Sequence, residues 1–130
     1  MKNPIEKFNK NYTEVIKILD INFSDMKVGQ KMLISSPKSI ANYINNIPFG
    51  EKRSIKQMRL DLAQKANADN TCPLTTGIFL RIAIEASLAD LYINNKPKLP
   101  FWRVISVKDN ISKKLSISQT ELLYLLNLES

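Results

Sequence analysis

The first twenty residues carry apolar side chains at intervals of three and four, the spacing of one helix face. A helix start precedes them, because Asn3 can accept a free N–H group and Pro4 suits the first helical position. Glu6 completes a capping box. We predict an N-terminal helix whose stripe covers the protein's own core or, alternatively, binds a partner helix. The stripe comprises Ile5, Phe8, Tyr12, Val15 and Leu19.

A second amphipathic segment follows an irregular stretch that ends in a short extended piece at residues 31–34. Ser36 and Pro37 form a helix start, and Pro48 ends this helix because its ring cannot continue it. A turn at Gly50 comes next. The inward positions of the helix are Ile40, Tyr43, Ile44 and Ile47.

Two further helices are predicted on either side of a turn at residues 69–73. Ser54 and Gln57 form a capping box that opens the first of them, which runs to about residue 67. Thr75 or Thr76 caps the second, which runs to about residue 94. The second helix is apolar on two sides, so we expect most of it to be buried.

Residues 94–99 read as a loop, and the β-branched residues at 101–107 predict a strand. A turn at residues 109–110 and a last helix capped by Ser118 follow. A short helix, a turn, a longer helix, a strand and a basic turn are the order of a winged helix-turn-helix. The predicted fold is therefore mostly α and winged helix-turn-helix-like, with a short strand in the wing and an added N-terminal helix. We expect an N-terminal helical extension over residues 1–35, packed on a domain of residues 36–130.

The net charge of the 130-residue chain is +7. Its excess lies in residues 38–114, which hold thirteen Lys and Arg against six Asp and Glu. A basic block suits a polyanion such as nucleic acid or an acidic membrane surface. It is equally a property of basic proteins without such a partner, so charge alone does not decide the function.

Histidine is absent, and Cys72 is the one cysteine. This excludes histidine-based acid–base catalysis and argues against a zinc site, and we predict neither a metal nor another cofactor. A single cysteine forms no internal disulfide, which fits a reducing cytoplasm. No apolar run approaches the ~20 residues that cross a membrane. We expect a cytoplasmic monomer without a membrane partner.

In a helix-turn-helix, the start of the second helix enters a DNA groove. Its N–H groups and partial positive charge favour phosphate, and its first polar side chains meet base edges. We therefore predict that the start of the second helix binds double-stranded DNA. Further polar and cationic residues of this surface precede the second helix or lie in the wing turn. This surface comprises Thr75, Thr76, Gly77 and Arg81 on the second helix, Lys52, Arg53, Ser54, Lys56 and Arg59 before it, and Lys113 and Lys114, with Lys108 nearby, in the wing.

Residues 99–105, Leu-Pro-Phe-Trp-Arg-Val-Ile, resemble the active-site segment Pro-Cys-His-Arg-Val-Val of the alkylguanine-DNA alkyltransferases. Residues 47–51, Ile-Pro-Phe-Gly-Glu, are similar to the opening of that family's first motif helix. Residues 80–86 resemble its recognition helix, and residues 122–129 its closing Leu-Leu-x-x-Glu segment. Residues 95–97, Asn-Lys-Pro, loosely resemble its Asn-Pro hinge. The resemblance covers roughly residues 36–129 of this chain, and the part of the family that it matches is the C-terminal, DNA-binding domain.

The resemblance implies that the chemistry of the family is lost. Phe101 stands at the position of the reactive cysteine and Trp102 at that of the histidine, and neither ring can act as nucleophile or base. We therefore predict no catalytic residue. Alkyltransferase-like members of the superfamily bind alkylated guanine without repairing it and recruit other repair proteins. The resemblance thus implies a DNA-binding protein that senses alkylated or otherwise modified bases, with a repair protein as partner.

Two of the candidate sites have alternative interpretations. In the family, the positions equivalent to Phe101 and Trp102 line the base pocket. The two rings of this chain therefore either stack on a base or fill the vacated pocket. Arg103 resembles the family's structural arginine, which ties loops together through charge-assisted hydrogen bonds. Arg81 falls where the family has the arginine that replaces a flipped-out guanine. It either enters the base stack or pairs with Glu85 one turn on.

Two other functions stay open. The chain could be a protein–protein adaptor that keeps the fold without binding DNA, with the N-terminal helix or the Phe101–Trp102 pocket as its surface. It could also be a transferase that uses Cys72, which lies near a helix start, where a thiolate is stabilised. The alternative for Cys72 is a small apolar residue in the turn.

Overall fold

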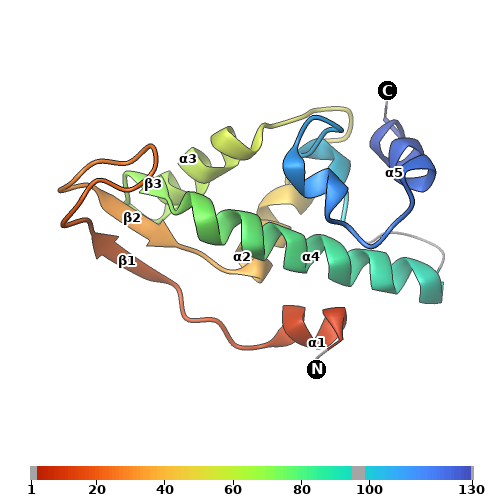
Figure 1. Ribbon diagram of the computed structural model, residues 1–130, viewed down its shortest axis with the longest axis horizontal. Helices are drawn as coiled ribbons and strands as arrows, with labels where there is room; N and C mark the ends of the chain where they lie inside the picture. The colour runs from red at the N-terminus through yellow and green to blue at the C-terminus, as the bar shows by residue number, and fades with distance from the viewer. Residues whose placement is uncertain (1–2, 95–98, 130) are drawn as a thin grey trace.

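The computed structural model describes residues 3–94 and 99–129. Over these ranges the chain forms five α-helices, three short strands and two 3-10 helices. Figure 1 shows α4 running along the molecule, with the sheet at one end and α5 at the other. The predicted loop and hinge at residues 95–98 lie outside the described residues. In chain order the elements are α1 (Pro4–Asn9), β1 (Val15–Ile18), β2 (Lys31–Ile34), α2 (Pro37–Asn45), α3 (Ile55–Lys65), β3 (Asn70–Thr71), α4 (Pro73–Asn94), η1 (Phe101–Arg103), η2 (Asn110–Lys113) and α5 (Gln119–Leu126).

β2 is the central strand of the sheet, so the extended piece predicted at residues 31–34 is confirmed. β1 runs antiparallel to it, with Val15 opposite Ile34, and β3 runs parallel on its other side. β1 and β2 lie within residues 1–35, and β3 lies within residues 36–130. One sheet therefore joins the two segments that the sequence analysis separated.

The N-terminal helix is shorter than predicted. Its start is confirmed, because the Asn3 side chain accepts the N–H three residues on at 2.8 Å. The helix ends at Asn9, however, and Val15 begins a strand instead of continuing a helical stripe. Asparagine is a poor helix former, and three of the four residues at 15–18 are β-branched, which favours extended backbone. Within residues 3–35, the helix is thus limited to Pro4–Asn9.

Serine caps begin three helices, as predicted. The hydroxyl oxygens of Ser36, Ser54 and Ser118 each accept the backbone N–H three residues on, at 3.0–3.2 Å. These bonds satisfy donors that the first helical turn leaves free. The turn at Gly50 is also confirmed, with a φ of +82° that glycine adopts without a steric penalty.

α4 begins earlier than predicted. Its first residue is Pro73, so Thr75 and Thr76 lie inside the helix and do not cap it. Proline suits this position because the first helical N–H has no partner within the helix. The predicted turn at residues 69–73 was also wrong in part, since it contains the strand β3, which pairs with β2.

α4 passes through the core, which also receives α2, α3, α5 and η1. Up to residue 91, the apolar residues of α4 are buried or half-buried on two sides, as predicted, except near the start of the helix, where Leu74 and Ile78 are exposed. None of the described helices combines the length and the apolarity that a bilayer span requires. The core residues of α4 include Leu80, Ala83, Ile84 and Leu88.

Residues 101–107 do not form the predicted strand. They begin with η1, in which Phe101 is fully buried and Trp102 is 7% exposed. Neighbouring side chains of a strand point to opposite faces, whereas here two adjacent rings are both buried. η2 takes the place of the predicted wing turn, and residues 99–129 contain no strand. The observed fold is a small, mostly helical α/β fold.

Candidate nucleic-acid interface

The first turns of α4 expose one side of the helix to solvent. Leu74 and Ile78 are 61% and 50% exposed, and Gly77 and Arg81 are exposed beside them. Spacings of three and four put these residues along one side of a helix. We call this side the outer face of α4.

A groove of about 400 Å³ separates the outer face from the start of α3 and from η2. We call it the η2 groove. Ile55 and Ile111 contribute apolar lining opposite α4, and Lys114 contributes a cation. Asp109 is the acid of this lining, and its carboxylate accepts the Ser106 backbone N–H at 2.8 Å. The groove therefore combines apolar walls with the positive charges of Arg81 and Lys114.

A second groove, of about 300 Å³, adjoins the first, because Ile55 and Asp109 line both. We call it the η1 groove. It brings together two sets of residues that the sequence analysis assigned separately. They are Lys52, Arg53 and Ser54 from the predicted DNA surface, and Trp102 and Arg103 from the predicted pocket.

The cations of the η1 groove already have partners within the protein. The Lys52 ammonium donates to the Trp102 carbonyl at 3.0 Å. Arg53 forms an exposed ion pair with Glu51 at 2.9 Å, and its backbone N–H donates to the Arg103 carbonyl at 2.7 Å. These bonds attach the turn before α3 to η1. Lys56, Lys113 and Lys114 are exposed, so their ammonium groups remain accessible from solvent.

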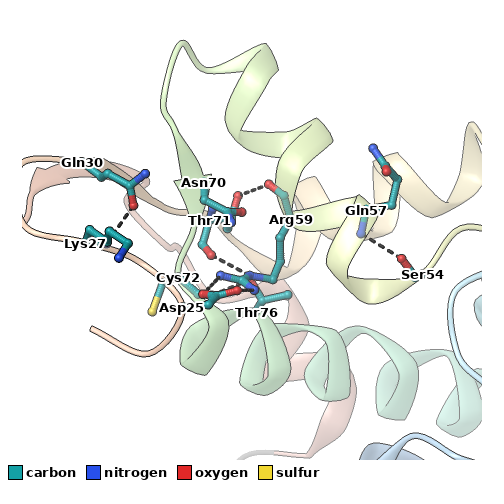
Figure 2. Close-up of polar contacts among 10 residues, drawn as sticks. All are labelled: Asp25, Lys27, Gln30, Ser54, Gln57, Arg59, Asn70, Thr71, Cys72 and Thr76. Carbon is teal, nitrogen blue, oxygen red and sulfur yellow. Dashed lines mark hydrogen bonds and ion pairs between the residues drawn. The ribbon is translucent and has the colours of Figure 1, made fainter. Parts of the chain in front are cut away.

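Arg59 was predicted to bind DNA, and its position contradicts that prediction. The residue is 6% exposed, and its two terminal nitrogens each donate to an Asp25 carboxylate oxygen at 2.8 Å (Figure 2). Its Nε donates to the Thr71 carbonyl at 2.8 Å. The hydrogen bonds from this guanidinium, opposed by desolvation, hold the pKa of Asp25 below its ordinary value. Arg59 therefore ties the β1–β2 connection to α3 and β3.

Thr76 was also assigned to the DNA surface, and it is fully buried. Its hydroxyl donates to the Cys72 carbonyl at 2.6 Å, one turn earlier (Figure 2). The neighbouring Thr75 is half-buried, and its hydroxyl oxygen has no hydrogen-bond partner within the described part of the chain. Both threonines lie inside α4 instead of at its exposed start, which is the physical reason for the error. Gly77 and Arg81 remain on the outer face.

The alternative partner suggested for Arg81 is engaged elsewhere. The Glu85 carboxylate accepts the Ser116 backbone N–H at 2.9 Å and the Ser116 hydroxyl at 2.6 Å. Arg81 forms no ion pair with any residue that the structure describes. Its guanidinium is therefore available to a ligand in the η2 groove.

The predicted base pocket is filled by its own aromatic rings. Phe101 and Trp102 meet edge to face, with 5.5 Å between ring centroids. The Trp102 indole N–H donates to the Glu129 carboxylate at 2.5 Å, and the Arg103 guanidinium donates to the Ile47 carbonyl at 2.7 Å. Of the two interpretations of Phe101, the fully buried ring fits the filling one. Arg103 ties segments together, as the resemblance implied.

Glu129 is the acceptor on which these contacts converge. Hydrogen bonds from Arg103, above all, lower its pKa to about 2, and bonds from Gly50 and Trp102 act in the same direction against desolvation. The residue belongs to the closing segment of the family resemblance, but its role as a shared acceptor could not be read from the sequence.

Cys72 immediately precedes α4, and its side chain is 4% exposed. It packs with the buried Met26 and Met32. A buried thiol among apolar side chains fits the structural interpretation of this cysteine. No group of three or more Cys, Asp or Glu residues placed to hold a metal ion occurs in residues 3–94 and 99–129.

Among known proteins, no family model, no curated protein and no solved structure matches this chain.

The apolar part of this candidate interface was not predicted from the sequence. Leu74, Ile78 and Ile111 line the η2 groove, but each belongs to a stretch whose apolar residues also read as core. Exposure of Leu74 and Ile78 depends on which elements cover α4. That is a tertiary property, and helical periodicity does not reveal it.

Proposed function

We propose that the chain is a non-enzymatic protein that binds double-stranded DNA through the outer face of α4. The observation that carries this proposal is the composition of the η2 groove. Exposed Leu74 and Ile78 lie beside Arg81, which has no ion-pair partner among the described residues, and Lys114 lines the groove with them. Cationic side chains bind phosphates, while apolar side chains contact base and sugar edges.

The order of elements supports a helix-turn-helix assignment. α3 is followed by a short connection, the longer α4 and then the basic segment around η2. In such motifs the second helix presents its exposed side to a groove of DNA. The resemblance to alkyltransferase C-terminal domains supports the same surface, because it assigns Arg81 to a DNA-contacting position. In this proposal the wing is the η2 turn and contains no strand.

The filled pocket bears on the mode of binding. A base that leaves the duplex needs an open site, and Phe101, at a position that the resemblance assigns to the base pocket, is fully buried. We therefore propose that the DNA stays paired when the chain binds. A role in repair would then depend on a partner protein, and alkylated guanine would be bound no more tightly than guanine.

A protein–protein adaptor is the second candidate function. β1 is an edge strand of the sheet, and its Val15, Ile16 and Ile18 side chains are exposed. Exposed edge strands pair with extended segments of other chains. This observation favours a binding surface for protein at the β1 edge of the sheet.

Fluorescence anisotropy with a random-sequence duplex tests the DNA-binding proposal. The double variant Arg81→Ala/Lys114→Ala removes two charges from the η2 groove. A matched control, Lys38→Ala/Lys65→Ala, removes two exposed charges from α2 and from the last turn of α3, where Lys65 lines a groove without any α4 residue.

The proposal predicts wild-type binding that weakens steeply with salt. In the first variant the log–log slope should fall by roughly 0.9 for each phosphate that the protein no longer neutralises. The control should bind like the wild type. Absence of binding at about 50 mM salt, where electrostatic binding is strong, would leave the adaptor function. A duplex containing one alkylguanine serves as a third arm, and tighter binding to it would show that the modified base is recognised.

A further inference from the structure

The outer face of α4 has a groove on its other side as well. This groove, of about 570 Å³, lies between α4 and the N-terminal segment, and we call it the α1 groove. Ile78 and Arg81 line both the α1 groove and the η2 groove. These two residues therefore stand on a ridge with a groove on each side.

The far wall of the α1 groove is basic. Lys7 and Lys10 line it, and both are exposed. Neither lysine forms an ion pair with a residue that the structure describes. The Lys10 ammonium lies 5.7 Å from the centroid of the Tyr12 ring, a cation–π distance that leaves its charge uncompensated.

Tyr12 fixes this wall against α4. Its ring meets Phe79 edge to face at 5.3 Å between centroids, and its hydroxyl donates to the Lys7 carbonyl at 3.1 Å. α1 itself packs along α4 (Figure 1). The backbone that carries the two lysines is thus held in place before a ligand arrives, which lowers the entropy lost on binding.

One acid lines the α1 groove, and its carboxylate is occupied. Glu85 accepts two hydrogen bonds from Ser116, as described above. Among the described residues that line the groove, three are cations, Lys7, Lys10 and Arg81, and one is an acid. The charge of the groove favours an anion.

We propose that Lys7 and Lys10 contact the phosphates of one DNA strand while Lys113 and Lys114, across α4, contact those of the other. Any groove of duplex DNA has one phosphate backbone on each side. A ridge with cations on both flanks matches that arrangement, and cations on one flank only would not. This inference rests on the proposed function and extends it, because it assigns a DNA contact to a segment outside the helix-turn-helix.

The double variant Lys7→Gln/Lys10→Gln tests the inference, with Lys38→Gln/Lys65→Gln as the control of equal charge. Thermal denaturation of both variants checks that the fold is intact. Without the two phosphate contacts, the log–log salt slope should fall by roughly 1.8. When the salt concentration rises from 50 to 200 mM, the factor by which the affinity falls should therefore be about tenfold smaller for the variant than for the wild type. The control should retain the wild-type slope.

A short duplex with one strand made entirely of neutral methylphosphonate linkages provides the second measurement. Neutralising one strand should weaken DNA binding by the wild type, because the wild type contacts the phosphates of both strands. It should hardly weaken binding by Lys7→Gln/Lys10→Gln, which contacts the phosphates of one strand only. An equal loss for the two proteins would overturn the inference. The inference would also be overturned if the Lys7→Gln/Lys10→Gln variant kept the wild-type salt slope while Arg81→Ala/Lys114→Ala bound DNA weakly. In that case the proposed function would still stand. Absence of wild-type binding would overturn both.

Discussion

Arg103 and Glu129 form an ion pair that joins η1 to the segment after α5. The Arg103 Nη2 and Glu129 Oε2 atoms are 2.8 Å apart, and the two side chains are 13% and 5% exposed. The same carboxylate accepts the Gly50 backbone N–H at 2.7 Å. The Glu129 side chain therefore holds η1 and the turn before α3 together, and these two segments line the η1 groove.

Removal of the Glu129 charge should destabilise the fold. Glu129→Gln leaves the Arg103 guanidinium buried without its counter-charge, and we expect a loss of about 3 kcal/mol, the lower end of the range for breaking a buried ion pair, because the amide still accepts hydrogen bonds. Urea denaturation measures the change. The matched control is Glu121→Gln, an exposed acid on α5, which should alter the free energy of unfolding by less than about 0.5 kcal/mol. Equal effects would show that the ion pair does not support the fold.

The pH dependence of stability should carry the signature of Glu129. Its folded-state pKa of about 2 lies below the ordinary value of 4.5, so its contribution is fully present above pH 4.5 and is lost as the pH falls towards 2. Wild-type stability should decline over this interval, with Asp25 acting in the same direction. Glu129→Gln should flatten the decline. Parallel curves for the two proteins in acid would contradict the assignment.

Arg59 should matter for stability and not for DNA binding. Arg59→Lys removes the paired bonds to Asp25 and should cost about 2 kcal/mol, since hydrogen bonds to charged groups contribute roughly 1.5–3 kcal/mol each. The control is Arg53→Lys, the same change in an exposed ion pair, where we expect less than about 1 kcal/mol. Denaturation and anisotropy measured on both variants separate the two roles. Weaker DNA binding by a fully folded Arg59→Lys variant would instead support the prediction from the sequence that Arg59 contacts DNA.

The chain should transfer no alkyl group. Phe101 and Trp102 carry no nucleophile, and the one thiol, on Cys72, is buried. Intact mass spectrometry after incubation with a duplex containing methylated guanine should show an unchanged protein mass. A mass gain of one methyl group that disappears in Cys72→Ser would instead establish the transferase hypothesis.

Local hydrogen bonds are the part of this fold that the sequence predicts well. The caps at Ser36, Ser54 and Ser118 each involve residues only three positions apart, so their partners are visible in the sequence. The strands were harder. Val15 fits the spacing of a helix stripe as well as a strand, and β3, two residues long, exists because it pairs with β2.

The candidate site was predicted only in part for a related reason. Gly77, Arg81 and Lys114 were assigned to the DNA surface and line one groove. Arg59 was assigned to it as well, but its partner Asp25 is 34 positions away and no local pattern connects them. Lys7 was not considered, because the contact between α1 and α4 is a result of folding.

The central claim is that the outer face of α4 binds DNA, and one pair of variants tests it most directly. Ile78 lies on the ridge between the two grooves and is 50% exposed, whereas Tyr124 lies on α5 and is 70% exposed. Ile78→Glu and Tyr124→Glu change the net charge equally. In anisotropy titrations with a random-sequence duplex at fixed salt, Ile78→Glu should bind roughly tenfold more weakly or worse, since it sets a carboxylate against phosphate, and Tyr124→Glu should bind like the wild type. Equal affinities of the two folded variants would contradict the claim.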